Sequence, residues 1–298
     1  MENHISDHSS QSLNRAFIVG IAINTIYVVV EVFAGIYYNS LSLISDAGHN
    51  LSDVAALGLA MLAFRLSKIK SNERFTYGYK KSTILVSLIN SVILFVAIGG
   101  ILWESIGRIM RPVNIDGVAV SVVAGIGIVV NTVSAFLFFR DKEHDLNVKG
   151  AYLHLLADAA VSFGVVVSGI FITLFSVYWI DVLMSFIIVI VIFYSTWQLF
   201  KESLYLTLDG VPHGVDLDFV SAEIMEINGV KSIHHIHVWA LSTTQNAFTA
   251  HIVVDSSCNL SEQLNIKQKV RKFLEANNIQ HATVELETSP TECAQIQC

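Results

Sequence analysis

Charged side chains are scarce in this sequence. Of its 298 residues only 14% are Asp, Glu, Lys or Arg, while 53% are hydrophobic. An ordinary soluble domain carries about 25% charged residues. The composition therefore favours an integral membrane protein. Residues 1–14 are polar and place no basic segment before the first apolar run, so a cleavable signal peptide is not expected.

Cysteine is also rare, and several catalytic motifs are missing. The three cysteines all come late, at Cys258, Cys293 and Cys298. An odd number in a segment expected to face the cytosol favours free thiols or metal ligands over a disulfide framework. The chain contains neither a Walker A loop nor an HExxH sequence, so ATP hydrolysis and zincin-type proteolysis are not predicted. The mildly acidic net charge of −7 gives no reason to expect a nucleic-acid partner.

Long hydrophobic runs, by contrast, are abundant. A helix needs about 20 mostly apolar residues to cross a bilayer. Six stretches qualify as transmembrane helices: 15–37, 41–64, 82–107, 116–139, 150–176 and 179–207. Lys and Arg gather between the second and third stretches and between the fourth and fifth. By the positive-inside rule these loops and both termini are predicted to be cytoplasmic.

The segment after Pro212 has the composition of a soluble domain. Its pattern predicts helix 215–227, strand 230–240, strand 246–255, helix 262–276 and strand 281–287. This αββαβ order predicts a small α+β open-faced sandwich. The expected organisation is a polar N-terminus at 1–14, a six-helix transmembrane domain at 15–209 and a cytosolic metal-binding domain at 210–298.

Two predicted spans carry the same polar motif. His49 and Asp53 lie four residues apart in the second, and His154 and Asp158 lie four residues apart in the fifth. This spacing puts both side chains of each pair on one helix face. Ionisable groups at membrane depth are costly and usually functional. Two imidazoles and two carboxylates that converge would form an N₂O₂ set suited to tetrahedral Zn²⁺.

The alternative for each pair is a hydrogen-bonded His–Asp couple that only holds helices together. Other polar groups lie near the motif, at Glu31, Asp46 and Asp181. Each is typical of a helix cap, an interfacial group or a pore-lining residue, and Asp46 is not expected to be a primary ligand.

The C-terminal segment holds a second group of ligand-type residues. Strand alternation places His235 and His237 on one face, with His251 on the neighbouring strand and Glu285 and Glu287 on the last. Cys293 and Cys298 follow them. Together these residues predict a second, cytosolic metal site. The alternative is a solvated polar face, which is the interpretation of His213, His234 and His281.

The motifs resemble those of the cation diffusion facilitator family, in its zinc-exporting type. The similarity covers nearly the whole chain, and its most specific segments are SLISDAGHNLSD and HLLAD, supported by RFTYGYKK, RIMRPV, LDGVP and HHIHVWAL. The resemblance implies a homodimer with six helices per protomer and a cytosolic ferredoxin-like domain. It also implies exchange of metal for protons, with His49, Asp53, His154 and Asp158 as the transport site.

The resemblance also assigns roles outside the membrane motif. His237, His251 and Glu287 match the ligand positions of the cytosolic domain, and Glu285 stands where some relatives have His. Lys81 and Asp209 resemble a charged pair that ties protomers together. The expected function is export of Zn²⁺, or of Co²⁺ or Cd²⁺, from the cytoplasm across a bacterial inner membrane.

Two other classes of protein fit part of the pattern. A membrane-anchored metal sensor would use the C-terminal site, but it would not need the four intramembrane ligands. A membrane metallohydrolase would need an open coordination position and a general base, whereas four protein ligands fill the coordination sphere of zinc.

Overall fold

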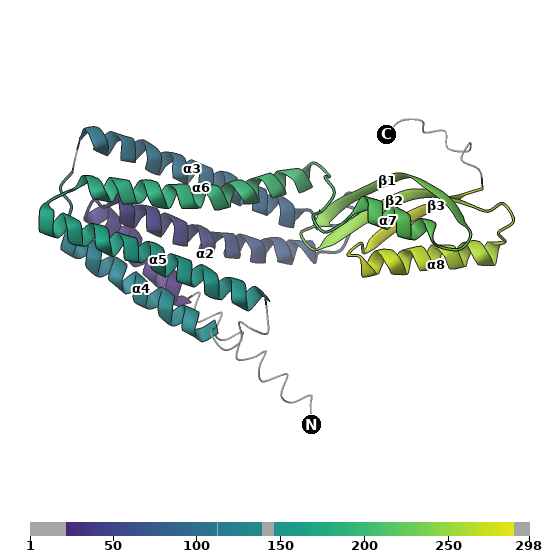
Figure 1. The fold of residues 1–298 in the computed structure, drawn as a ribbon, viewed down its shortest axis with the longest axis horizontal. Coiled ribbons are helices and arrows are strands. Elements are labelled where there is room, and N and C mark those ends of the chain that lie inside the picture. The colour runs from purple at the N-terminus through teal and green to yellow at the C-terminus, as the bar shows by residue number, and fades with distance from the viewer. Residues whose placement is uncertain (1–21, 112, 139–145, 289–298) are drawn as a thin grey trace, which may run out of the picture. The chain divides into compact units, whose positions relative to one another are not determined.

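The computed structural model describes residues 22–111, 113–138 and 146–288 (Figure 1). Within these ranges, the side chains of residues 53, 56–58, 60, 61, 64, 137, 138 and 146–151 are not described. The chain divides into two compact units. The first comprises Met1–Gly58 and Asn90–Gln198, and the second comprises Leu59–Ile89 and Leu199–Cys298.

Long helices make up most of the first 207 residues. They are Ala22–Tyr37, α2 (Leu41–Ser67), α3 (Ser82–Met110), α4 (Gly117–Phe138), α5 (Leu146–Phe175) and α6 (Trp179–Thr207) (Figure 1). Four of the described helices, α3 to α6, are long and apolar enough to cross a membrane. The prediction of spans is confirmed for these four. The helix Ala22–Tyr37 is shorter, and α2 is long but carries polar residues along its length.

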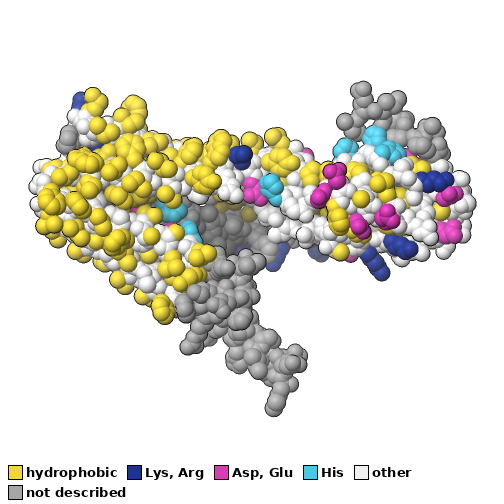
Figure 2. Space-filling model, viewed as in Figure 1, with side chains coloured by type: hydrophobic (Ala, Val, Ile, Leu, Met, Phe, Trp, Pro, Cys, Tyr) yellow, Lys and Arg dark blue, Asp and Glu magenta, His cyan; other side chains and the backbone are white. Residues whose placement is uncertain are grey.

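The helical unit exposes apolar side chains to its surroundings. Hydrophobic side chains cover much of the surface of the helices (Figure 2). Among the largest exposed ones are Trp103, Tyr194 and Phe136. A smaller apolar core lies inside, formed by residues such as Leu43, Val165 and Ile188. An apolar exterior of this kind fits contact with lipid, because a soluble monomer rarely exposes large contiguous apolar patches.

A buried carboxylate fixes the start of α2. Asp181, in the first turn of α6, accepts hydrogen bonds from the Leu41 backbone N–H at 2.6 Å and from the Ser40 hydroxyl at 2.6 Å. The first N–H groups of a helix have no partner within the helix. Asp181 of α6 therefore caps the N-terminus of α2, which agrees with one of the roles expected for it.

The C-terminal part of the second unit has the predicted order of elements. It runs α7 (Leu217–Met225), β1 (Val230–Ser242), β2 (Gln245–Val254), α8 (Leu260–Ala276) and β3 (His281–Glu287). The αββαβ order is confirmed. The sheet has the order β1-β2-β3, with β1 antiparallel and β3 parallel to β2.

One face of this sheet is covered by helices and holds the core. Phe248 and Ile252 of β2 belong to one buried cluster with Ile224 of α7 and Leu274 of α8. Asn259 begins α8 with a capping box, because its side chain accepts from the Glu262 N–H and the Glu262 carboxylate accepts from the Asn259 N–H. Ligand-type side chains lie on the other face.

The charged pair expected from the resemblance also belongs to the second unit. Lys81 Nζ lies 2.5 Å from Asp209 Oδ1, and both side chains are exposed. The two residues therefore pair within one chain.

Candidate metal centres

Three of the four predicted membrane ligands converge. His49 of α2 and His154 and Asp158 of α5 place one ligand atom each within 4.8 Å of one another. His49 Nε2 lies 3.3 Å from Asp158 Oδ1, and His154 Nε2 lies 3.6 Å from Asp158 Oδ2. Asp53 lies one turn after His49 in α2, but its side chain lies outside the described residues.

The spacing of these ligand atoms suits a small metal ion. Ligands held about 2.0–2.2 Å from a tetrahedral Zn²⁺ stand about 3.3–3.6 Å apart. The two His–Asp separations, 3.3 and 3.6 Å, fall within this range. The carboxylate of Asp158 offers one oxygen to each imidazole. The same contacts are ion pairs when the imidazoles are protonated and no metal is bound, so the arrangement is compatible with both states.

Exposure changes sharply across this cluster. The Asp158 side chain is 3% exposed, whereas that of His49 is 16% and that of His154 is 47% exposed. Among the three ligand side chains, His154 is therefore the most accessible and Asp158 the most deeply buried.

The C-terminal unit contains a second cluster of ligand atoms. His234 of β1, His251 of β2 and Glu287 of β3 place one ligand atom each within 4.8 Å of one another. His251 Nδ1 lies 2.6 Å from Glu287 Oε1, and His234 Nε2 lies 3.3 Å from Glu287 Oε2. The Glu287 carboxylate is buried and is shared between the two imidazoles.

The interpretation of His234 as an ordinary polar residue does not fit this geometry. His234 pairs with His251, and His237 pairs with Thr249. Between these two pairs β1 therefore has one residue more than β2. The extra residue forms a β-bulge, in which His235 adopts a left-handed conformation with φ of 50°. The bulge reverses the alternation of β1 and sets His234 directly opposite His251. Regular period-2 alternation had placed His234 on the other face.

The other predicted members of this site lie at varying distances from it. Glu285 Oε2 is 3.7 Å from His251 Nε2, and the His235 ring lies 5.3 Å from the His251 ring. His237 is exposed and lies opposite Thr249, farther along the strand. Among the described residues it is not one of the three whose ligand atoms converge. Cys293 and Cys298 lie outside the described residues.

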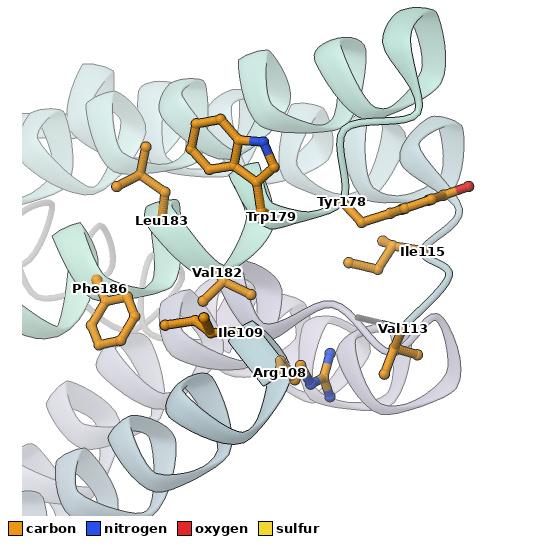
Figure 3. Close-up of a pocket in the computed structure, with 9 residues that line it drawn as sticks. All are labelled: Arg108, Ile109, Val113, Ile115, Tyr178, Trp179, Val182, Leu183 and Phe186. Carbon is orange, nitrogen blue, oxygen red and sulfur yellow. The ribbon is translucent and has the colours of Figure 1, made fainter. Parts of the chain in front are cut away.

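A separate pocket in the helical unit is unsuited to a metal ion. It has a volume of about 260 Å³ and is lined by Arg108, Ile109, Val113 and Ile115 and by side chains around the start of α6 (Figure 3). Figure 3 shows mostly apolar and aromatic side chains, with the Arg108 guanidinium as its charged group. Arg108 donates to the Glu104 carboxylate and to the Asn39 carbonyl. A cationic, apolar lining offers no metal ligand.

Four described helices apolar enough for a bilayer, and a His–Asp cluster between α2 and α5, indicate a membrane protein with a candidate metal site inside its helical unit. Two family models match the chain: the cation efflux transmembrane domain over residues 17–206, and the cation efflux protein, cytoplasmic domain, over residues 212–289. The chain therefore belongs to the cation efflux family. It is a transporter and not an enzyme.

Named relatives are similar over nearly their full length. The "Cadmium, cobalt and zinc/H(+)-K(+) antiporter" of Bacillus subtilis is 33% identical, over 95% of this chain and 91% of the relative. The "Metal cation efflux system protein CzcD" of Cupriavidus metallidurans is 33% identical, over 98% and 92%. The "Zinc transporter ZitB" of Escherichia coli is 30% identical, over 97% and 92%.

One solved structure is similar in sequence to the C-terminal region. It is the "Metal-bound C-terminal domain of the CzcD transporter from Cuprividus metallidurans", at 32% identity. The match covers 24% of this chain and 99% of that chain, with a TM-score of 0.23.

Proposed function

We propose that this protein exports a divalent metal ion, with Zn²⁺ as the preferred substrate, from the cytoplasm in exchange for protons. The ligands of the transported ion are His49, Asp53, His154 and Asp158. The observation that carries this proposal is the convergence of His49, His154 and Asp158 between two helices of the apolar bundle. Asp53 completes the set by its position one turn from His49 on α2.

The donor atoms favour zinc and similar ions. Two imidazoles and two carboxylates suit Zn²⁺, Co²⁺ and Cd²⁺, whereas a site made only of oxygen would favour Mn²⁺. The names of the relatives include zinc, cadmium and cobalt, which supports the same set of substrates. Two Asp carboxylates balance the charge of one dication while the imidazoles bind in their neutral form.

Proton exchange follows from the same ligands. A protonated His cannot bind a metal, so protons and metal compete for one site. In the proposed alternating-access cycle, metal enters from the cytoplasm while the site is open on the His154 side. Protons reach the ligands when the site opens to the other side, and they favour release there. The name of the Bacillus subtilis relative includes potassium as well as protons, so a potassium gradient is a second driving force to test.

The arrangement in the membrane completes the proposal. We place six spans within residues 15–209, of which the first is represented by Ala22–Tyr37 and the second by α2. The positions of Lys and Arg favour cytoplasmic termini in a bacterial inner membrane. Residues 1–14 form the polar N-terminus in this arrangement.

We assign residues 210–298 to a cytosolic ferredoxin-like domain that joins two protomers into a homodimer. The αββαβ order and the match to a cytoplasmic domain of cation efflux proteins support this assignment. The cluster of His234, His251 and Glu287 is its candidate regulatory metal site. Zinc bound there would report the cytosolic concentration to the transport unit. A protein that only senses metal would not need the intramembrane ligands.

The test is metal flux in vesicles that contain the purified protein. The wild type should accumulate Zn²⁺ against its gradient when a pH gradient is imposed, and His49→Ala and Asp158→Asn should each abolish this flux. His281→Ala is the matched control, because His281 lies beside Tyr77 in the second unit, outside both clusters. Unchanged flux in His49→Ala would refute the proposal. Metal-dependent hydrolysis without flux would favour the metallohydrolase.

A further inference from the structure

A pair of buried carboxylates lies next to the membrane site without belonging to its ligands. Glu31 of the helix Ala22–Tyr37 and Asp46 of α2 are each 0% exposed. Asp46 precedes His49 by three residues, which places it about 4.5 Å nearer the start of α2 at Leu41. The pair is therefore displaced from the metal ligands toward the connection between residues 37 and 41, which is the extracytoplasmic side in the proposed orientation.

Hydrogen-bond donors reach three of the four carboxylate oxygens. The Tyr27 hydroxyl donates to Glu31 Oε1 at 2.8 Å, and the Asn50 amide donates to Glu31 Oε2 at 3.4 Å. The Ser162 hydroxyl donates to Asp46 Oδ2 at 2.9 Å. Asp46 Oδ1 is buried and has no donor among the described residues. A buried carboxylate oxygen without a donor is costly.

A proton between the two acids would supply the missing donor. The Glu31 and Asp46 side chains lie close enough to hydrogen-bond one another once one of them is protonated. Two carboxylates at this separation, away from water, cannot both be ionised without a cation. The main electrostatic neighbours of the pair are each other, His49 and Asp158. A proton on Glu31 would supply the bond that Asp46 Oδ1 lacks.

Titratable groups on three helices interact with the pair. Tyr27 lies on the same helix as Glu31, His49 lies on α2 with Asp46, and Asp158 lies on α5. α4 contributes the Val123 carbonyl, which accepts from Tyr27, and no titratable group among its described residues. A dication bound by His49 and Asp158 would therefore bring positive charge close to Asp46.

We propose that Glu31 and Asp46 form a proton-binding site, distinct from the metal ligands, that holds one proton while the metal site is empty and releases it when the metal binds. This inference rests on the proposed function, because it assigns to this pair one of the protons exchanged for metal. On metal binding the O–H bond of the shared proton breaks, both carboxylates become ionised, and the proton passes to the water that reaches the metal site. When the site opens to the other side, the pair takes up a proton from that side and weakens metal binding.

The proton count on metal binding tests the proposal. Zn²⁺ is titrated calorimetrically into the full-length protein in buffers of equal pH and different ionisation enthalpy, which yields the protons released per metal. Glu31→Gln and Asp46→Asn should each release about one proton fewer than the wild type. Contributions from other metal sites cancel in the difference. Glu104→Gln is the matched control, because Glu104 pairs with Arg108 on α3, and it should leave the count unchanged.

A measurement on the wild type keeps the proposal testable if the variants do not fold or bind. Infrared difference spectra should show the C=O stretch of a protonated carboxyl group disappearing when Zn²⁺ is added. If the band does not change, or if Glu31→Gln releases as many protons as the wild type, this inference is wrong. If the proposed transport function itself were wrong, the result would be another one: His49→Ala would bind and transport metal as the wild type does.

Discussion

At the scale of single residues, the position of one histidine decides the ligands of the C-terminal site. The β-bulge at His235 sets His234 opposite His251 and leaves His237 opposite Thr249. The resemblance to the family pointed to His237, whereas the ligand atoms that converge belong to His234, His251 and Glu287. His234 and His237 are therefore expected to contribute differently to metal affinity at this site.

We expect His234→Ala to weaken zinc binding at this site by at least about tenfold, because it removes a nitrogen that lies 3.3 Å from the Glu287 carboxylate. His237→Ala should leave the affinity within about twofold, since the residue is exposed and outside the converging atoms. Equilibrium dialysis of the full-length protein in a His49→Ala background isolates the site. A larger loss in His237→Ala than in His234→Ala would contradict this geometry.

Asp255 gives the C-terminal domain a predictable response to acid. Hydrogen bonds from the Ser257 backbone N–H and hydroxyl, together with the Lys231 ammonium, lower the pKa of the exposed Asp255 carboxyl. The folded domain therefore binds this proton more weakly than the unfolded chain. The stabilisation is complete above the ordinary Asp pKa of about 3.9 and disappears as the pH falls through the lower folded value.

Asp255→Asn should accordingly melt at a lower temperature than the wild type at neutral pH, because it loses the charge that Lys231 contacts. The difference should shrink as the pH falls below about 4, because the unfolded wild-type chain then binds a proton at Asp255 more readily than the folded domain does. Calorimetric melting of both full-length proteins at the two pH values measures this. A difference that does not depend on pH would show that Asp255 acts through its shape alone.

At the scale of elements, the sequence predicted the α5 and α6 spans well because their apolar runs are long and continuous. It also predicted that His154 and Asp158 share a helix face, since i and i+4 positions always do. The close approach of α2 to α5 did not follow from periodicity, because helix packing depends on the whole bundle. The bulge in β1 was not predicted either. It depends on a positive φ at His235, and a glycine at that position would have indicated such a conformation.

Glycines set how closely α4 and α5 approach. A Cβ at Gly169 would meet the Ser121 hydroxyl and the Gly117 carbonyl, and a Cβ at Gly117 would meet Gly169 and Thr173. Small residues at a helix contact let two backbones come close within a membrane. His154 and Asp158 lie on α5, so this contact also helps to position the metal ligands.

Gly169→Val should therefore destabilise the helical unit by about 1–3 kcal/mol, as overpacking of a close contact does. Gly125→Val is the matched control on α4, because a Cβ at Gly125 meets nothing within 4 Å. The melting temperature of each variant in detergent gives the comparison. Equal melting temperatures for the two variants would mean that the helices separate without penalty.

At the scale of the whole molecule, the two groups of candidate metal ligands belong to different units and have different surroundings. The cluster of His49, His154 and Asp158 belongs to the first unit, among apolar helices, whereas that of His234, His251 and Glu287 belongs to the second. A transported ion must bind and leave in every cycle, while a regulatory ion only has to change the balance between conformations. The two clusters should therefore affect different kinetic quantities.

We expect His251→Ala to keep the maximal transport rate within about twofold and to raise the zinc concentration for half-maximal transport by at least about fivefold, a typical strength for coupling between two sites. His49→Ala should instead abolish the maximal rate at every zinc concentration, because no excess of metal replaces a missing ligand. Initial rates in vesicles over a range of cytosolic-side zinc concentrations separate the two effects. If His251→Ala lowers the maximal rate with an unchanged half-saturating concentration, the C-terminal cluster supports the transport path itself and does not report on cytosolic zinc.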